Sequence, residues 1–112
     1  DIVSNTDAKG FPHYNIKKLN DGEWQIDFAL AGFTKDSIDI NVKDNTLTVK
    51  GEMESDEDEY LYKGISTKKF FKTFSLAEYT EPTDATMKNG ILTITLKQEL
   101  PEEKKPRSIK IK

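Results

Sequence analysis

The chain has 112 residues, of which 35% are hydrophobic and 33% charged, and this composition suits one domain with a modest core and a well-solvated surface. Its net charge of −3, with acids and bases intermixed, argues against a nucleic-acid partner, and the absence of cysteine excludes disulfides and thiolate-metal sites. No apolar run approaches the roughly 20 residues of a membrane span and no basic-apolar leader opens the chain, so we expect a cytoplasmic protein.

Alternating apolar and polar side chains predict a series of strands. In residues 23–30, the apolar residues Trp24, Ile26, Phe28 and Leu30 fall on every second position. The same period of two recurs at 38–43, 46–50, 70–76 and 92–97. The β-branched and aromatic residues in these stretches suit a pleated, half-buried surface.

Turn signals separate these strands. Asp44-Asn45 lies between two alternating stretches and predicts a tight hairpin, because both residues tolerate a left-handed backbone. Asn89-Gly90 is the strongest short-range hairpin signal in the chain. Ala31-Gly32-Phe33 ends the first long strand, and residues 34–36 suit one short turn. Without a convincing amphipathic helix, this pattern indicates an antiparallel sandwich or barrel.

Residues 52–67 form a long connection that does not fit the sandwich pattern. The segment begins with an acidic run at 52–59 and then becomes aromatic and strand-like at Tyr60, Leu61 and Tyr62. Connections of this length are usually functional or disordered. Two interpretations remain open, namely a strand exchanged with the sheet edge of another subunit, or an ordinary surface loop with two tucked tyrosines.

The end of the chain, residues 101–112, combines a charged, proline-bounded stretch with two isoleucines. We expect an extended, flexible segment up to Ser108. In an extended chain Ile109 and Ile111 point the same way and Lys110 points opposite. The two isoleucine side chains suit docking along an exposed strand edge. The alternative is a final edge strand of the chain's own sheet.

Four motifs carry a resemblance to a known family. They are Phe11-Pro12-His13-Tyr14-Asn15-Ile16, Ala31-Gly32-Phe33 followed by a 38–51 hairpin, residues 85–92 (A-x-x-x-N-G-V/I-L), and the I-x-I of Ile109-Lys110-Ile111. In this order and spacing, residues 11–112 resemble bacterial-type small heat-shock proteins with an α-crystallin domain, with most similarity to the inclusion-body-binding subgroup.

The resemblance implies an all-β, immunoglobulin-like antiparallel sandwich with a swapped loop strand and flexible termini. Residues 1–10 would be the remnant of an N-terminal arm, and 11–100 the α-crystallin domain. Within that domain, 52–67 would be the long loop with the dimerisation strand. Residues 101–112 would be the C-terminal extension that carries the anchor.

The resemblance also implies two interfaces. In the dimer, Tyr60, Leu61 and Tyr62 would pair with the partner's strand near Tyr14 and Ile16. The family commonly has arginine in its F-x-R-x-F motif, where this chain has Lys72. Lysine keeps the charge but loses the bidentate fork, so an ion network there would be weaker. The anchor residues Ile109 and Ile111 would dock in a neighbouring dimer's groove, lined by Ile38, Ile40, Val42, Thr83, Ala85 and Met87.

The function that the resemblance implies is an ATP-independent holdase chaperone. Its homodimers would assemble into larger homo-oligomers, bind unfolding client proteins, and pass them indirectly to ATP-driven chaperones. No cofactor is expected. The single histidine, His13, and the lack of nucleophile or phosphate-loop motifs argue against an enzyme. The acidic run lacks the spacing of a calcium loop.

Two rival classes remain open. A monomeric co-chaperone sandwich of the related CS-domain type would have no need of the I-x-I motif. A carbohydrate-binding sandwich would use an exposed aromatic platform, whereas we expect Trp24 in the core or at the dimer surface.

Overall fold

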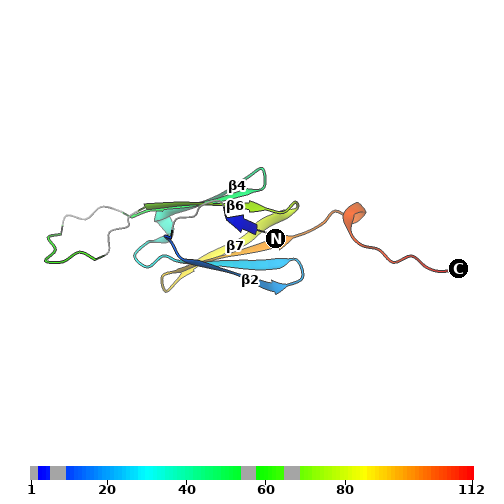
Figure 1. Ribbon diagram of the computed structural model, residues 1–112, viewed down its shortest axis with the longest axis horizontal. Helices are drawn as coiled ribbons and strands as arrows, with labels where there is room; N and C mark the ends of the chain where they lie inside the picture. The colour runs from blue at the N-terminus through cyan, green and yellow to red at the C-terminus, as the bar shows by residue number, and fades with distance from the viewer. Residues whose placement is uncertain (1–2, 6–9, 54–57, 65–68) are drawn as a thin grey trace.

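The computed structural model describes residues 3–5, 10–53, 58–64 and 69–112. These residues form two four-stranded antiparallel sheets packed face to face (Figure 1). One sheet has the order β1 (Val3–Asn5), β6 (Lys69–Leu76), β5 (Thr46–Glu52), β4 (Ile38–Lys43). The other has the order β2 (Tyr14–Asn20), β3 (Glu23–Ala29), β8 (Ile91–Gln98), β7 (Thr80–Lys88). The predicted all-β sandwich is confirmed.

The core lies between the sheets and follows the alternation of the sequence. Successive side chains of a strand point to opposite faces, so every second residue of the inner strands is buried. On β3 and β8, for example, Ile26 lies opposite Ile94 and Phe28 opposite Leu92. Burying each such side chain yields roughly 1.5–3 kcal/mol. The fully buried members are Ile26, Phe28, Leu30, Leu47, Val49, Phe74, Ile94 and Leu96.

Both predicted hairpins are confirmed. Asp44 and Asn45 have φ values of 50° and 62°, and Asn89 and Gly90 have values of 52° and 77°. Positive φ at both central residues is the type I′ geometry, whose twist matches that of the flanking strands. The short turn expected at residues 34–36 is a 3-10 helix at Lys35–Ser37.

The structure adds one strand that neither the alternation nor the family resemblance indicated. Residues Val3–Asn5, assigned above to an N-terminal arm, pair antiparallel with β6, with Val3 opposite Leu76. Three residues are too few to show an alternation, so the pattern gave no signal. The pairing makes β1, and not β6, the last strand of that sheet.

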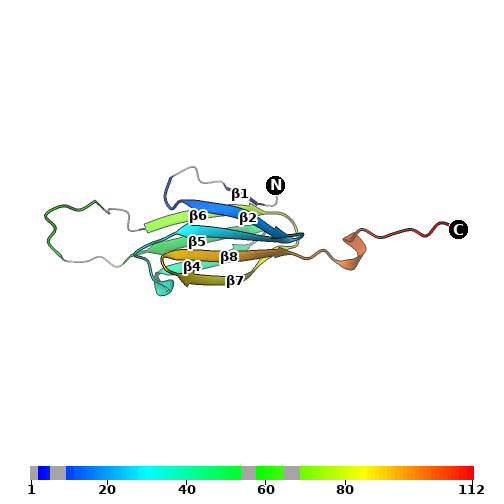
Figure 2. The same ribbon diagram turned by 90° about the horizontal axis from the view of Figure 1, so that it is seen from below.

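The loop between β5 and β6 and the tail after β8 extend from opposite ends of the sandwich (Figures 1 and 2). They draw the molecule out to 79 Å along its longest axis, against 25 and 22 Å across it. A 3-10 turn, η2 (Glu102–Lys104), interrupts the tail, and residues 105–112 beyond it contain neither helix nor strand.

Candidate functional site: open sandwich edges and projecting segments

β4 and β7 lie along the same side of the sandwich, and each is the last strand of its sheet among the described residues (Figure 2). Ile38, Ile40 and Val42 alternate along β4 and lie opposite Gly51, Val49 and Leu47 of β5. They therefore point inward, but with no further strand beside them they are only partly buried. These three residues form an apolar row along the β4 edge, where the sequence analysis expected one wall of a groove.

The opposite wall comes from β7. Met87 and Ala85 lie opposite the core residues Leu92 and Ile94 of β8, so both face inward. The register then shifts between Pro82 and Asp84, which leaves Thr83 without a partner on β8 and places Pro82 opposite Leu96. Thr83 is exposed, whereas Pro82 is partly buried. We propose a groove between these two edge strands and call it the β4–β7 groove. Its lining would be the residues that the strand register turns inward: Ile38, Ile40, Val42, Pro82, Ala85 and Met87.

Sequence reasoning missed Pro82, although a signal for it was present. Proline lacks a backbone N–H and is confined within sheets to edge strands or bulges. Its occurrence inside Thr80–Lys88 therefore indicated both an edge strand and a break of register. Counting every second residue back from Met87 gives Ala85 and then Thr83. The strand has one extra residue between Pro82 and Asp84, so the next residue with an inward register is Pro82.

The tail residues Ile109 and Ile111 are 82% and 94% exposed. No strand forms in residues 105–112, so the alternative of a final edge strand in the chain's own sheet is wrong. Two β-branched side chains thus remain in water at the end of a segment that leads away from the sandwich (Figure 1). This placement is costly unless another surface covers them.

The other open side lies at β2, the last strand of its sheet. Tyr14 is partly buried and packs edge-on against Phe74 at 5.4 Å between ring centroids. Ile16 faces inward opposite Ile26 but keeps 39% of its surface exposed. Lys72 of β6 is fully buried, and its Nζ lies 5.7 Å from the centre of the Tyr14 ring. The structure therefore brings Tyr14 and Lys72 together beneath this edge, where the cation interacts with the ring.

The loop residues expected to form a dimerisation strand project away from the sandwich. Tyr60, Leu61 and Tyr62 are 48%, 110% and 87% exposed. Residues 58–64 contain no strand, and the Lys63 ammonium lies 5.0 Å from the centre of the Tyr60 ring. The two tyrosines are therefore not tucked against the chain's own core. The middle of the acidic run, 54–57, lies outside the described residues.

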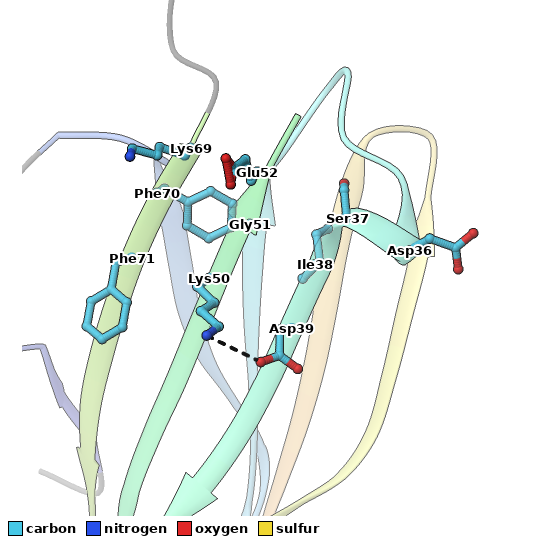
Figure 3. Close-up of a pocket in the computed structure, with 10 residues that line it drawn as sticks. All are labelled: Asp36, Ser37, Ile38, Asp39, Lys50, Gly51, Glu52, Lys69, Phe70 and Phe71. Atoms are coloured by element: carbon cyan, nitrogen blue, oxygen red, sulfur yellow. Dashed lines mark ion pairs between the residues drawn. The ribbon is translucent and has the colours of Figure 1, made fainter. Parts of the chain in front are cut away.

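A pocket of about 740 Å³ lies at the loop end of the β4–β5–β6 sheet (Figure 3). The Phe70 ring covers Gly51 there, and the Lys50 ammonium lies 3.9 Å from the Asp39 carboxylate. Phe71, also in the lining, is 57% exposed on the outer face. The sequence analysis missed Phe71, yet the Phe70-Phe71 doublet was a signal, because neighbouring residues of a strand face opposite sides.

Other features bear on the remaining functional classes. Trp24 is partly buried and packs against the core, which removes it as an exposed sugar platform. His13 is exposed in the segment before β2. Within the described ranges, no three His, Cys, Asp or Glu side chains are grouped so as to hold a metal ion. A helix long and apolar enough to cross a membrane is also absent from that part of the chain.

Comparison with known proteins identifies the family. The model of the Hsp20/alpha crystallin family matches residues 16–112. The chain belongs to the Hsp20/alpha crystallin family. Small heat shock protein HspE of Bradyrhizobium diazoefficiens is 43% identical over 112 residues, covering 99% of this chain and 73% of HspE. Small heat shock protein IbpB of Serratia proteamaculans is 41% identical over 107 residues, covering 94% and 75%.

Solved structures of Hsp20/alpha crystallin proteins share the fold. A C-terminally truncated form of AgsA from Salmonella typhimurium superposes with a TM-score of 0.74 at 25% identity, covering 91% of this chain and all of AgsA. A small heat-shock protein from Xylella fastidiosa gives a TM-score of 0.72 at 20% identity, covering 94% and 99%, a likeness of fold. Membership supports a chaperone role in a family that forms oligomers and is not known for catalysis.

Proposed function

We propose that this protein is an ATP-independent holdase chaperone that assembles into oligomers and binds unfolding proteins, which prevents their aggregation. The observation that carries the proposal is the coexistence of two features in one chain. Ile109 and Ile111 are almost fully exposed on a projecting tail, and in the part of the chain that the structure describes no further strand covers the apolar edges of β4 and β7. Family membership supports the same conclusion.

The tail and the groove fit each other chemically. In an extended tail Ile109 and Ile111 point the same way, as do Ile38, Ile40 and Val42 along β4. Docking two isoleucines gains roughly 1.5–3 kcal/mol each, from which the cost of ordering the tail is subtracted. One contact is therefore weak, about millimolar to micromolar. Many such contacts in one assembly give avidity while each still opens readily.

The β2 edge supports a second contact between subunits. Its outer side has no neighbouring strand among the described residues, so its backbone groups can pair with an incoming strand. The exposed Tyr60–Tyr62 stretch suits that role, with Tyr14 and Ile16 at the receiving edge. We propose exchange of this stretch between two subunits as the basis of the dimer.

Clients would bind to the surfaces that assembly covers. Heating shifts the population toward smaller species with open grooves and edges. Those apolar surfaces can then hold hydrophobic segments exposed on unfolding proteins. Delivery of clients to ATP-driven chaperones and a cytoplasmic location remain predictions of the sequence.

The test is a heat-aggregation assay with a thermolabile client enzyme and no nucleotide. The account expects this protein to suppress turbidity at less than one subunit per client molecule, and added ATP to change nothing. An unrelated β-sandwich protein of similar mass is the control and leaves the turbidity in place. The absence of protection at every ratio would contradict the proposal.

A further inference from the structure

The chain contains two sulfur atoms, those of Met53 and Met87, because it has no cysteine. Both side chains are partly buried and pack against the core. Met53 follows β5 at the base of the loop, where a Cβ added to Gly32 would lie 2.6 Å from its Cε. Met87 lies on β7 and belongs to the wall of the β4–β7 groove. The two thioethers therefore differ in whether they face the groove.

Met87 is open to small solutes because β7 has no further strand on its outer side within the described residues. Its side chain lies at the loop end of the groove, three positions before Gly90, whose carbonyl accepts the Leu30 N–H. Ile38 lies on β4 opposite Gly51, next to the loop that follows Met53. Gly90 lies against Ala31, and Gly32 lies against Met53, so Ile38 and Met87 are at the same end of the sandwich. An isoleucine docked at this end would lie beside Met87 and reduce its exposure to solvent.

Oxidation changes this wall from apolar to polar. A peroxide transfers one oxygen atom to the thioether sulfur, so the O–O bond breaks, an S=O bond forms from a sulfur lone pair, and water leaves. The product, methionine sulfoxide, carries a strong hydrogen-bond acceptor. The side chains of docked isoleucines offer it no donor, and burying an unsatisfied polar group is unfavourable.

We propose that Met87 is an oxidation site through which peroxides weaken docking of the tail and so release subunits from the assembly. The inference rests on the proposed tail–groove contact. It adds a link between docking and oxidation, because a docked tail shields Met87 from peroxide and an undocked tail leaves Met87 accessible. Peroxide therefore oxidises Met87 while the tail is undocked, and the oxidised Met87 then disfavours renewed docking.

The first test measures binding of a fluorescent peptide with the sequence of residues 101–112. The receiving protein is the full chain with Ile109→Ala and Ile111→Ala, so that its own tail does not compete. After peroxide treatment that adds one oxygen to Met87 by mass spectrometry, the peptide affinity should fall about tenfold or more. Circular dichroism should show the sandwich still folded.

Two variants distinguish the effect of oxidising Met87 from the effect of oxidising Met53. In the Met53→Leu background peroxide should still weaken binding, whereas in Met87→Leu the affinity, whatever its starting value, should not change on peroxide treatment. Unchanged affinity with Met87 fully oxidised would overturn the inference and leave tail docking intact. A peptide that fails to bind the unoxidised protein would overturn tail docking itself, and the inference with it.

A second measurement needs no groove variant. The oxidation rates of Met87 and Met53 are compared by mass spectrometry in the unmodified chain and in the Ile109→Ala, Ile111→Ala chain. Met87 should oxidise several times faster when the tail cannot dock, and Met53 should oxidise at the same rate in both. Equal Met87 rates in both chains would contradict shielding by the tail.

Discussion

Gly51 lies under the ring of Phe70, its partner across β5 and β6 (Figure 3). A Cβ built on Gly51 would lie 2.5 Å from the Phe70 ring and 3.3 Å from the backbone oxygen of Ser37. The ring has little room to move, because it packs edge-on against Phe33 with centroids 5.3 Å apart and against Phe11 at 6.1 Å. At the scale of single residues, this aromatic cluster fixes the loop end of the sandwich.

Gly51→Ala should therefore destabilise the sandwich. The added methyl group forces the Phe70 ring out of its packed position, and overpacking of this kind costs about 1–3 kcal/mol. The free energy of unfolding is measured by chemical denaturation. Gly10→Ala is the matched control, since nothing lies within 4 Å of a Cβ at Gly10, and it should change stability by less than about 0.5 kcal/mol. Equal effects of the two substitutions would contradict the packing account.

Lys72 shows what single-residue reasoning could and could not predict. The sequence places it on the same face as Phe70 and Phe74, which proved to be the core face. That the ammonium is fully buried and lies near the Tyr14 ring depends on how two sheets meet, which no alternation within one strand reveals. Exposure of Phe71, in contrast, follows from the alternation itself.

At the scale of elements, the strands and hairpins were predictable because local chemistry determines them. Period-two alternation and Asp44-Asn45 or Asn89-Gly90 turns need no tertiary information. The exceptions are β1, which is too short for a pattern, β2 and β7, which only the family resemblance indicated, and the register shift at Pro82. The register therefore places Pro82 where the sequence predicted Thr83, and the pocket beside Phe71 was not predicted.

The loop makes a prediction at this scale. Leu61 and Tyr62 are 110% and 87% exposed, so Leu61→Ser with Tyr62→Ser should leave the stability of the sandwich within about 0.5 kcal/mol. If the stretch pairs with the β2 edge of another subunit, the same change should weaken the dimer about tenfold or more. Sedimentation over a dilution series measures the pairing.

The control for this loop variant is Asp58→Ser, an exposed position of the same loop outside the apolar stretch. It should leave the dimer constant close to that of the unmodified chain. A dimer unaffected by loss of Leu61 and Tyr62 would show that subunits pair through another surface.

At the scale of the whole molecule, the positions of the loop and the tail favour contacts between copies. They leave the sandwich at opposite ends, and the longest dimension of 79 Å is about three times the other two (Figure 1). A tail that points away from its own groove and a loop that points away from its own β2 edge each suit a different subunit. Assembly is thus the physical outcome expected of exposed apolar groups that the single chain leaves uncovered.

The mass of the assembly, measured by multi-angle light scattering, tests this account most directly. The unmodified chain should form large oligomers, and Ile109→Ala with Ile111→Ala should reduce them toward dimers, because the tail then has nothing to bury in the β4–β7 groove. Lys110→Ala, which alters the opposite face of the same tail, should leave the oligomers largely intact. An assembly of unchanged mass in the double variant would contradict the account.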